Sequence, residues 1–181
     1  MATMPHITVL IALKDAIATA LARKAFGPNK DVKPKVRHYR HRNSAKGEWP
    51  CLAIRYVSHD PSSTVGRDED DYGNPEVMME LAVNLTYDFK LPPEFDKFDD
   101  GVDPDPTGFG TPAEIIAEVL DLLLPGTDQG VNTLGGTIWD IRSDGAAPET
   151  DELSSDQGRV EERLVLLYRV RGDRPTILLK G

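Results

Sequence analysis

The chain has 181 residues, of which 39% are hydrophobic and 28% charged, a composition typical of one soluble globular domain. Acidic residues outnumber basic ones by 30 to 21, and the formal net charge of −9 argues against non-specific binding to nucleic acids. The single cysteine, Cys51, excludes an intrachain disulfide and a cysteine-rich zinc site. No uninterrupted run of about 18 apolar residues occurs, so we expect no membrane contact and one cytosolic domain over residues 1–181.

The first predicted element is a helix over Ile7–Ala25, and the Gly27-Pro28 pair that follows it is typical of a helix end. Frequent alanines in this segment raise its helix propensity. Its apolar side chains recur at steps of three and four residues, which places them along one stripe: Leu10, Leu13, Ile17 and Leu21. We therefore expect the helix to pack with this stripe against another layer.

Three strands are predicted next. Lys35–Arg42 is a weak candidate because it is polar on both faces, whereas Glu48–His59 is stronger and begins near Pro50. Val77–Phe89 gives the clearest signal, because apolar and polar residues alternate along its whole length. We expect one face of this long strand to be buried and the other to be mostly exposed to water.

A second helix is predicted over Thr111–Leu124. Thr111 is placed as the N-cap, Pro112 as the first helical residue and Glu114 as the residue that completes a capping box. The residues from Ile115 onward supply a broad apolar face, and Pro125-Gly126 follows the predicted end.

A short strand over Thr137–Arg142 and a long one over Arg159–Val170 complete the predicted elements. Because strands and helices do not alternate as β-α-β units, we expect an α+β fold rather than a doubly wound parallel sheet. The prediction is an antiparallel sheet of about four to five strands with both helices packed on one face. Long acidic loops are predicted at residues 61–75, 91–110 and 142–158, and loops of this length are usually functional.

Charge is distributed unevenly along the chain. The segment Arg23–Lys46 contains nine basic residues and one acidic residue, whereas Asp60–Asp105 contains 14 acidic residues and three basic ones. Such asymmetry is typical of partner surfaces, although two solvated loops that touch within one fold would give the same pattern.

The motifs of common enzymes are missing from the sequence. It has no nucleophile elbow, no zinc-protease motif, no P-loop and no dinucleotide-binding glycine motif. Cys51 follows Pro50 in a predicted strand, where a small buried thiol is the usual case. We therefore expect that the chain is not an enzyme and uses no cofactor.

Two groups of residues invite a metal interpretation. Acidic residues cluster around Gly101, but an EF-hand register would place Phe98 and Thr107 at ligand positions, so we expect no metal site there. The His38 and His41 side chains would lie on opposite faces of a strand. His6 and His59 are isolated in the sequence, so no histidine pair predicts a metal site either.

In its layout the chain resembles the tail-terminator proteins of long-tailed bacteriophages, the minor tail protein U-like group. Four features that cover most of the chain carry this resemblance: the alanine-rich helix Ile7–Ala25, the long strand Val77–Phe89 with Lys90-Leu91-Pro92 after it, the capped helix Thr111–Leu124, and the closing strand Leu164–Val170 followed by Arg174-Pro175. They form a pattern of elements without a signature residue, and the loops make the chain longer than that group leads us to expect.

The resemblance implies a structural virion protein that forms a ring, as a hexamer, on the head-proximal end of the tail tube. Such a ring ends tube elongation and presents a surface for the head connector, and DNA is only passing cargo in its channel. The implied partners are further copies of the chain, the tail tube protein and the connector or neck protein. The implied location is the virion tail, and the host cytoplasm during assembly.

Two other functions stay open at this point. One is a head-completion, neck or baseplate-side connector of a phage, and the other is a metal-dependent or hydrolytic enzyme that uses the loop Asp96–Asp105. For a ring, we predict basic residues on one side of a subunit contact: Arg37, Arg40 and Arg42. Acidic residues are predicted on the other side or in the channel: Asp96, Asp99, Asp100 and Asp103.

Overall fold

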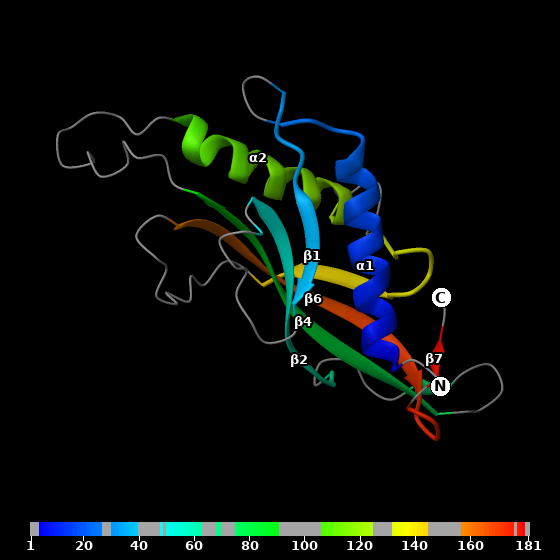
Figure 1. Cartoon of the computed structure of the whole chain (residues 1–181). Coiled ribbons are helices and arrows are strands. Elements are labelled where there is room, and N and C mark those ends of the chain that lie inside the picture. The colour runs from blue at the N-terminus through cyan, green and yellow to red at the C-terminus, as the bar shows by residue number, and fades with distance from the viewer. Residues whose placement is uncertain are drawn as a thin grey trace.

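The computed structural model of the chain describes residues 4–26, 30–39, 48, 50–62, 68–69, 75–90, 106–124, 132–144, 157–175 and 177–179. The elements are, in chain order, α1 (Pro5–Ala22), β1 (Lys35–Tyr39), β2 (Cys51–Pro61), β3 (Asp68–Glu69), β4 (Pro75–Lys90), α2 (Pro106–Leu123), β5 (Asp140–Ser143), β6 (Gln157–Arg171) and β7 (Leu178–Leu179) (Figure 1). Two helices and one sheet confirm the predicted α+β class.

Within the described part of the chain, one sheet of seven strands has the order β1-β2-β4-β6-β5, with β3 beside β4 and β7 beside β6. Five of its six pairings are antiparallel, but β1 runs parallel to β2. The expectation of a purely antiparallel sheet is wrong at this edge, because the connection after Tyr39 is long enough to return the chain to the same end of the sheet. The two-residue strands β3 and β7 were missed because they are too short to show a period.

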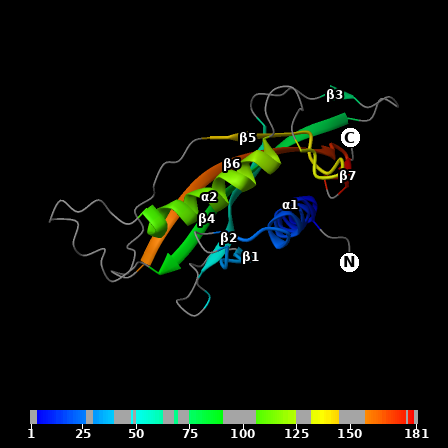
Figure 2. The same cartoon turned by 90° about the horizontal axis from the view of Figure 1, so that it is seen from above.

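Strand β4 is the centre of the sheet, since it pairs with β2 on one side and with β6 on the other. Its predicted alternation is confirmed: Leu81, Val83 and Leu85 are fully buried and join the helices in one core. Core residues of β2 and β6 lie in register with them, as Ile54 does with Leu85. Figure 1 shows both helices across the same face of the sheet, as expected. In Figure 2 β1 and β5 lie at its two opposite edges.

Helix α1 begins at Pro5 and ends at Ala22, slightly earlier at both ends than predicted. The predicted stop at Gly27-Pro28 lies outside the described residues. By length and a mean hydropathy of 1.4, α1 would suffice to cross a membrane. Its predicted apolar stripe is nevertheless buried in the core, with Leu13 and Ile17 fully enclosed, so α1 packs as a core helix.

Helix α2 begins at Pro106, so the predicted N-cap at Thr111 is wrong, and residue 111 lies within the helix. The sequence contains two prolines that suit a first helical turn, and the helix uses the earlier one. The predicted apolar face is confirmed, because Ile115, Val119 and Leu123 are buried in the core.

The strand ends and predicted loops also differ from expectation. Strand β2 begins at Cys51 rather than at Glu48. Strand β5 begins at Asp140 rather than at Thr137, because residues 134–136 form a turn with positive φ angles. The first predicted loop, 61–75, contains β3, and the second, 91–110, ends inside α2. Most of these two loops and of 142–158 lies outside the described residues.

The end of the β4–β6 pair depends on a glycine. Gly158 is in register with Phe89, whose ring lies directly over it. A Cβ atom at position 158 would lie 2.6 and 2.8 Å from the Cε2 and Cε1 atoms of that ring, which is closer than van der Waals contact permits. We predict that Gly158→Ala lowers the free energy of unfolding by about 1 to 3 kcal/mol.

Urea unfolding of a double-mutant cycle measures this effect. Phe89→Leu alone should destabilise the fold, but adding Gly158→Ala to that variant should cost much less than it costs in the parent chain. Equal costs in the two backgrounds would show that the phenylalanine ring is not the obstacle.

Two buried tyrosines predict the response of the fold to alkaline pH. Burial raises the pKa of Tyr87 and of Tyr168 to about 12, with smaller contributions from Cys51 and Tyr56 respectively. An unfolded tyrosine has a pKa of about 10. Because the folded chain holds these protons more tightly, their stabilising contribution is complete below about pH 10 and is lost between about pH 10 and 12.

Titration of the phenolate absorbance measures this prediction. Among the five tyrosines, two should ionise late, and Tyr87→Phe and Tyr168→Phe should each remove one late group. A single common transition for all five tyrosines in the folded chain would contradict it.

Candidate functional site

The sheet face that points away from the two helices carries most of the charged groups of the strands, and we call it the charged face. It consists of the residues of β4 that alternate with the core residues, and of their neighbours in register on β2, β5 and β6. Its polar members are Arg55, Ser58, Asp60, Glu76, Glu80, Asn84, Thr86, Asp88, Asp140, Arg142, Arg159, Glu161, Arg163 and Arg169. The expectation that this face of β4 is mostly exposed to water is wrong: Met78, Ala82, Thr86 and Asp88 are buried and the other described residues of the face are half-buried, because long side chains of the neighbouring strands form ion pairs over it.

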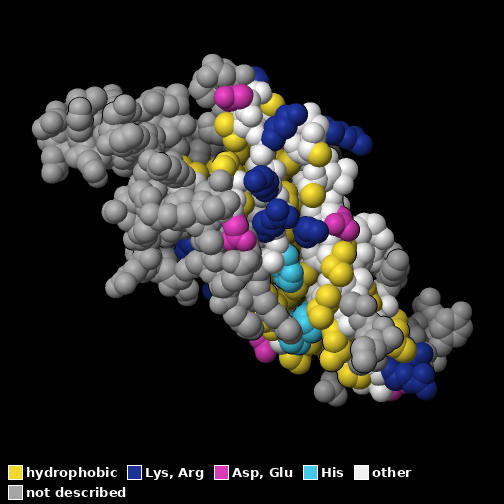
Figure 3. Space-filling view, viewed as in Figure 1, with side chains coloured by type: hydrophobic (Ala, Val, Ile, Leu, Met, Phe, Trp, Pro, Cys, Tyr) yellow, Lys and Arg dark blue, Asp and Glu magenta, His cyan; other side chains and the backbone are white. Residues whose placement is uncertain are grey.

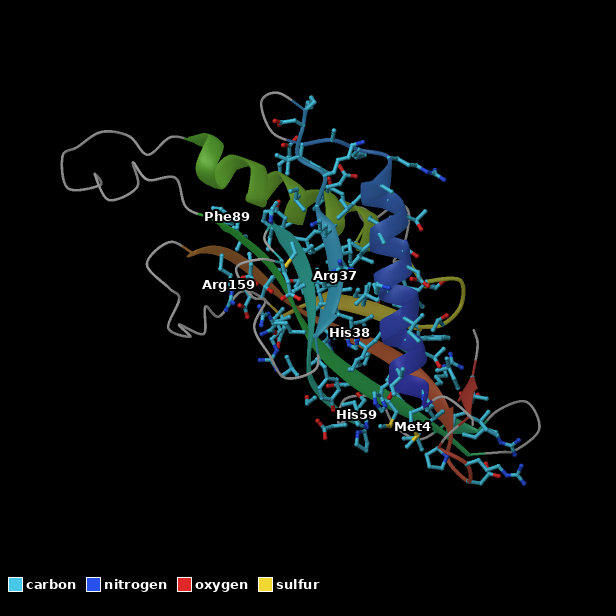
Figure 4. All side chains as sticks on the ribbon, viewed as in Figure 1. Met4, Arg37, His38, His59, Phe89 and Arg159 are labelled. Atoms are coloured by element: carbon cyan, nitrogen blue, oxygen red, sulfur yellow. The ribbon has the colours of Figure 1, made fainter. Side chains whose placement is uncertain are left out.

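At one end of this face, Asp88 is fully buried between two arginines. Its Oδ2 atom accepts a hydrogen bond of 2.9 Å from Nη2 of Arg55, and its Oδ1 atom accepts one of 2.7 Å from Nε of Arg159. Nε of Arg55 also donates to the hydroxyl oxygen of Thr86, at 2.8 Å. Both arginines are largely buried, and Figure 4 shows Arg159 near the end of the sheet that Phe89 marks.

Burial lowers the pKa of Arg55, and the neighbouring Asp88 carboxylate opposes this change. A buried carboxylate that accepts from two guanidinium groups has its charge compensated, so this group is suited to fixing strand register.

Farther along the same face, a hollow of about 400 Å³ opens over the neighbouring side chains of Ala82 and Val165. Its polar lining residues come from β2, β4, β5 and β6 and from the residue after β5: Ser58, Asp60, Glu80, Arg142, Asp144 and Arg163. Three carboxylates face two guanidinium groups, so the lining has an excess of one negative charge. Small side chains in the floor leave the space, and the charged groups form its rim.

Two ion pairs use four of these five charges. Arg142 lies 3.1 Å from Glu80, and Nε of Arg163 lies 3.4 Å from Asp144. The latter contact lacks hydrogen-bond geometry, so Nε of Arg163 is buried without an acceptor among the described residues. Asp60 has no ion pair with any residue that the structure describes, and it is directly opposite Glu80 in the β2–β4 register.

Trp139, which precedes β5, is exposed over 54% of its surface. The guanidinium group of Arg169 lies 3.6 Å from the centre of its ring, and Arg169 is held by Glu76 at 3.1 Å. An exposed tryptophan stacked on a fixed arginine is typical of the central residues of protein interfaces.

A second cluster, on the helix side, joins the start of α1 to β2. The rings of His6 and His59 are stacked with centroids 4.2 Å apart, and the Tyr56 hydroxyl shares a hydrogen bond of 2.6 Å with Nδ1 of His59. Figure 4 accordingly shows His59 close to Met4. The two histidines that are isolated in the sequence are therefore neighbours in the fold.

Of the predicted interface residues, only Arg37 falls within the described part of the chain. It lies on β1, is exposed, and has no ion pair with a described residue. The others lie outside the described residues: Arg40, Arg42, Asp96, Asp99, Asp100 and Asp103. Their predicted pairing and the predicted acidic channel therefore stay predictions.

Among the described residues, no group of three histidine, cysteine, aspartate or glutamate side chains is arranged to hold a metal ion. Cys51 is buried, as its position in the strand predicts. A comparison with protein-family models gives no match, and a comparison with curated proteins gives none either.

Sequence reasoning missed the group formed by Arg55, Asp88 and Arg159, and the hollow as well. The alternation of β4 placed Asp88 on the polar face, but only the strand register shows which arginines reach it. The sequence did contain one signal, namely opposite charges at matching positions of the two long strands. When Leu81 is aligned with Leu166, Asp88 is directly opposite Arg159.

We predict that Asp88→Asn lowers the free energy of unfolding by about 3 to 5 kcal/mol, because two largely buried arginines lose their shared carboxylate. Urea unfolding gives this value, and Asp121→Asn on exposed α2 surface is the matched control, with an expected change within about 0.5 kcal/mol. Equal stability of the two variants would contradict the structural importance assigned to Asp88.

Proposed function

We propose that the chain is a structural protein of a phage tail, which forms a ring on the head-proximal end of the tail tube. The ring ends tube elongation and offers a surface to the head connector. This proposal combines the resemblance in element layout with one structural observation, namely that the described sheet carries a basic edge strand and, on its charged face, a hollow with an excess of negative charge.

The difference between these two surfaces carries the proposal. Strand β1 forms one edge within the described sheet, and the exposed basic residues Lys33, Lys35 and Arg37 lie on it or just before it. Figure 3 shows Lys and Arg side chains gathered over this region. The hollow with its excess negative charge lies on the charged face and spans the strands from β2 to β5.

Two unlike surfaces on one molecule suit head-to-tail contacts, and such contacts close into a ring when the rotation between copies permits it. A surface that contacts itself would instead favour a dimer. The net charge of −9 also suits a ring around passing DNA, because like charges keep the DNA from binding to the wall.

We predict that the full chain forms closed rings of one size, either alone or on the ends of tubes assembled from the tail tube protein of the same phage. Native mass spectrometry gives the number of copies, for which the resemblance implies six. Electron microscopy of labelled protein gives its position, and added chain should shorten the tubes in proportion to its concentration.

If electron microscopy finds the labelled protein at the opposite end of the tail, or on the neck away from the tube, the connector function is favoured instead. A chain that stays monomeric at high concentration and is absent from tube ends would exclude the ring.

A further inference from the structure

We propose that the hollow on the charged face binds the edge strand β1 of a second copy, with Arg37 of that copy paired to Asp60. This inference rests on the proposed function, because it states which surfaces meet in the ring. It replaces the acidic loop as the partner of Arg37 by a carboxylate that the structure describes.

The first step concerns Asp60. It lies directly opposite Glu80 on the neighbouring antiparallel strand, and like charges in that position repel each other. Arg142 is engaged with Glu80 and Arg163 lies beside Asp144, so both guanidinium groups of the hollow are already used. A cation brought from outside would pair with Asp60 and relieve the repulsion.

The second step concerns the shape of the hollow. Its volume of about 400 Å³ is sufficient for a long side chain, and its floor of Ala82 and Val165 is apolar. An arginine can lay its aliphatic stem on such a floor while its guanidinium group remains at the charged rim. A lysine would also bring charge, but only arginine presents a planar fork to a carboxylate.

The third step concerns the strand that carries the arginine. Arg37, Lys35 and Lys33 are all exposed, and none of them has an ion pair with a described residue. Among the described strands, β1 is paired only with β2, so no second described strand lies along its other edge, and an edge strand of this kind is where another chain can add.

The fourth step concerns Trp139 and the direction of the contact. Trp139 does not line the hollow, but it is stacked on Arg169 of the charged face and adds an exposed aromatic ring to that face. A pair of copies that exchanged both contacts would close as a dimer, so the proposed ring requires instead that each copy offers its strand to one neighbour and its hollow to another. This arrangement is head-to-tail, as a ring requires.

The test uses charge reversal in the full-length chain, with assembly measured by native mass spectrometry and, where the free chain is monomeric, by binding to tube ends. Arg37→Glu and Asp60→Arg should each raise the concentration needed for half-assembly about tenfold or more, because like charges then meet. Arg23→Glu and Asp121→Arg, exposed positions on or beside the helices, change the net charge equally and should assemble as the parent does.

Mixing the Arg37→Glu variant with the Asp60→Arg variant gives the sharpest result. In a ring where they alternate, Glu at position 37 meets Arg at position 60, and the next contact pairs Arg37 with Asp60 as in the parent. An equal mixture should therefore assemble again, in rings that contain an even number of copies. The double variant within one chain should also recover assembly.

Asp60→Asn separates an interface role from a structural one. It removes the repulsion with Glu80, so the isolated chain should melt at the same or a slightly higher temperature while it assembles less well. A lower melting temperature with unchanged assembly would overturn the inference.

The two proposals fail in different ways. If the parent forms rings and both charge-reversal variants form them equally well, the contact is overturned and the ring function stays in place. The same holds if the variants fail to assemble and mixing them does not restore assembly. A parent chain that never assembles, in solution or on tubes, would remove the ring function and this contact together.

Discussion

The strict alternation along β4 between residues that face the core and residues that face away from it is the constraint on which the rest of the structure depends. Because β4 pairs with β2 and β6 along nearly its whole length, each of its residues fixes the face to which its neighbours point. Leu81, Val83 and Leu85 direct one face toward α1 and α2, and the residues between them direct charged groups to the other. A shift of register by one residue would bring Asp88 into the apolar core, so the hydrophobic and ionic patterns select the same register.

The pair of arginines around Asp88 adds a second control on that register. Burying three charged groups costs desolvation energy, and the same volume filled by apolar residues would often be at least as stable. The ionic group has a different advantage, because it is satisfied only when β2, β4 and β6 align correctly. In a sheet whose strands have apolar residues at every second position, such selectivity distinguishes the native alignment from shifts by two residues, which the hydrophobic pattern alone tolerates.

The sequence predicted the elements much better than their partners. Periodicity found both helices, and it found β2, β4 and β6, because each shows its pattern over several turns or many alternations. The start of α2 was misplaced because the Thr111-Pro112 pattern is a local signal that competes with an equally acceptable proline at position 106. The parallel β1 and the hollow depend on which strands become neighbours, and a single sequence contains no direct measure of that. The contact of His6 with His59 was missed for the same reason, since it joins α1 to β2.

The basic edge of the sheet has two opposite consequences for assembly. Charged side chains on an edge strand, lysine above all, discourage unplanned pairing with other sheets, and this protects β1, which has no second described strand beside it. The same charges favour one partner surface, namely a rim with a carboxylate such as Asp60, which has no ion pair with any described residue. In the proposed ring, repulsion between basic edges suppresses irregular aggregates, and attraction between edge and hollow favours one ordered contact. The free energy of each contact need only be modest, because closure of a ring gives every copy two contacts, and a bound tube end raises the local concentration of copies.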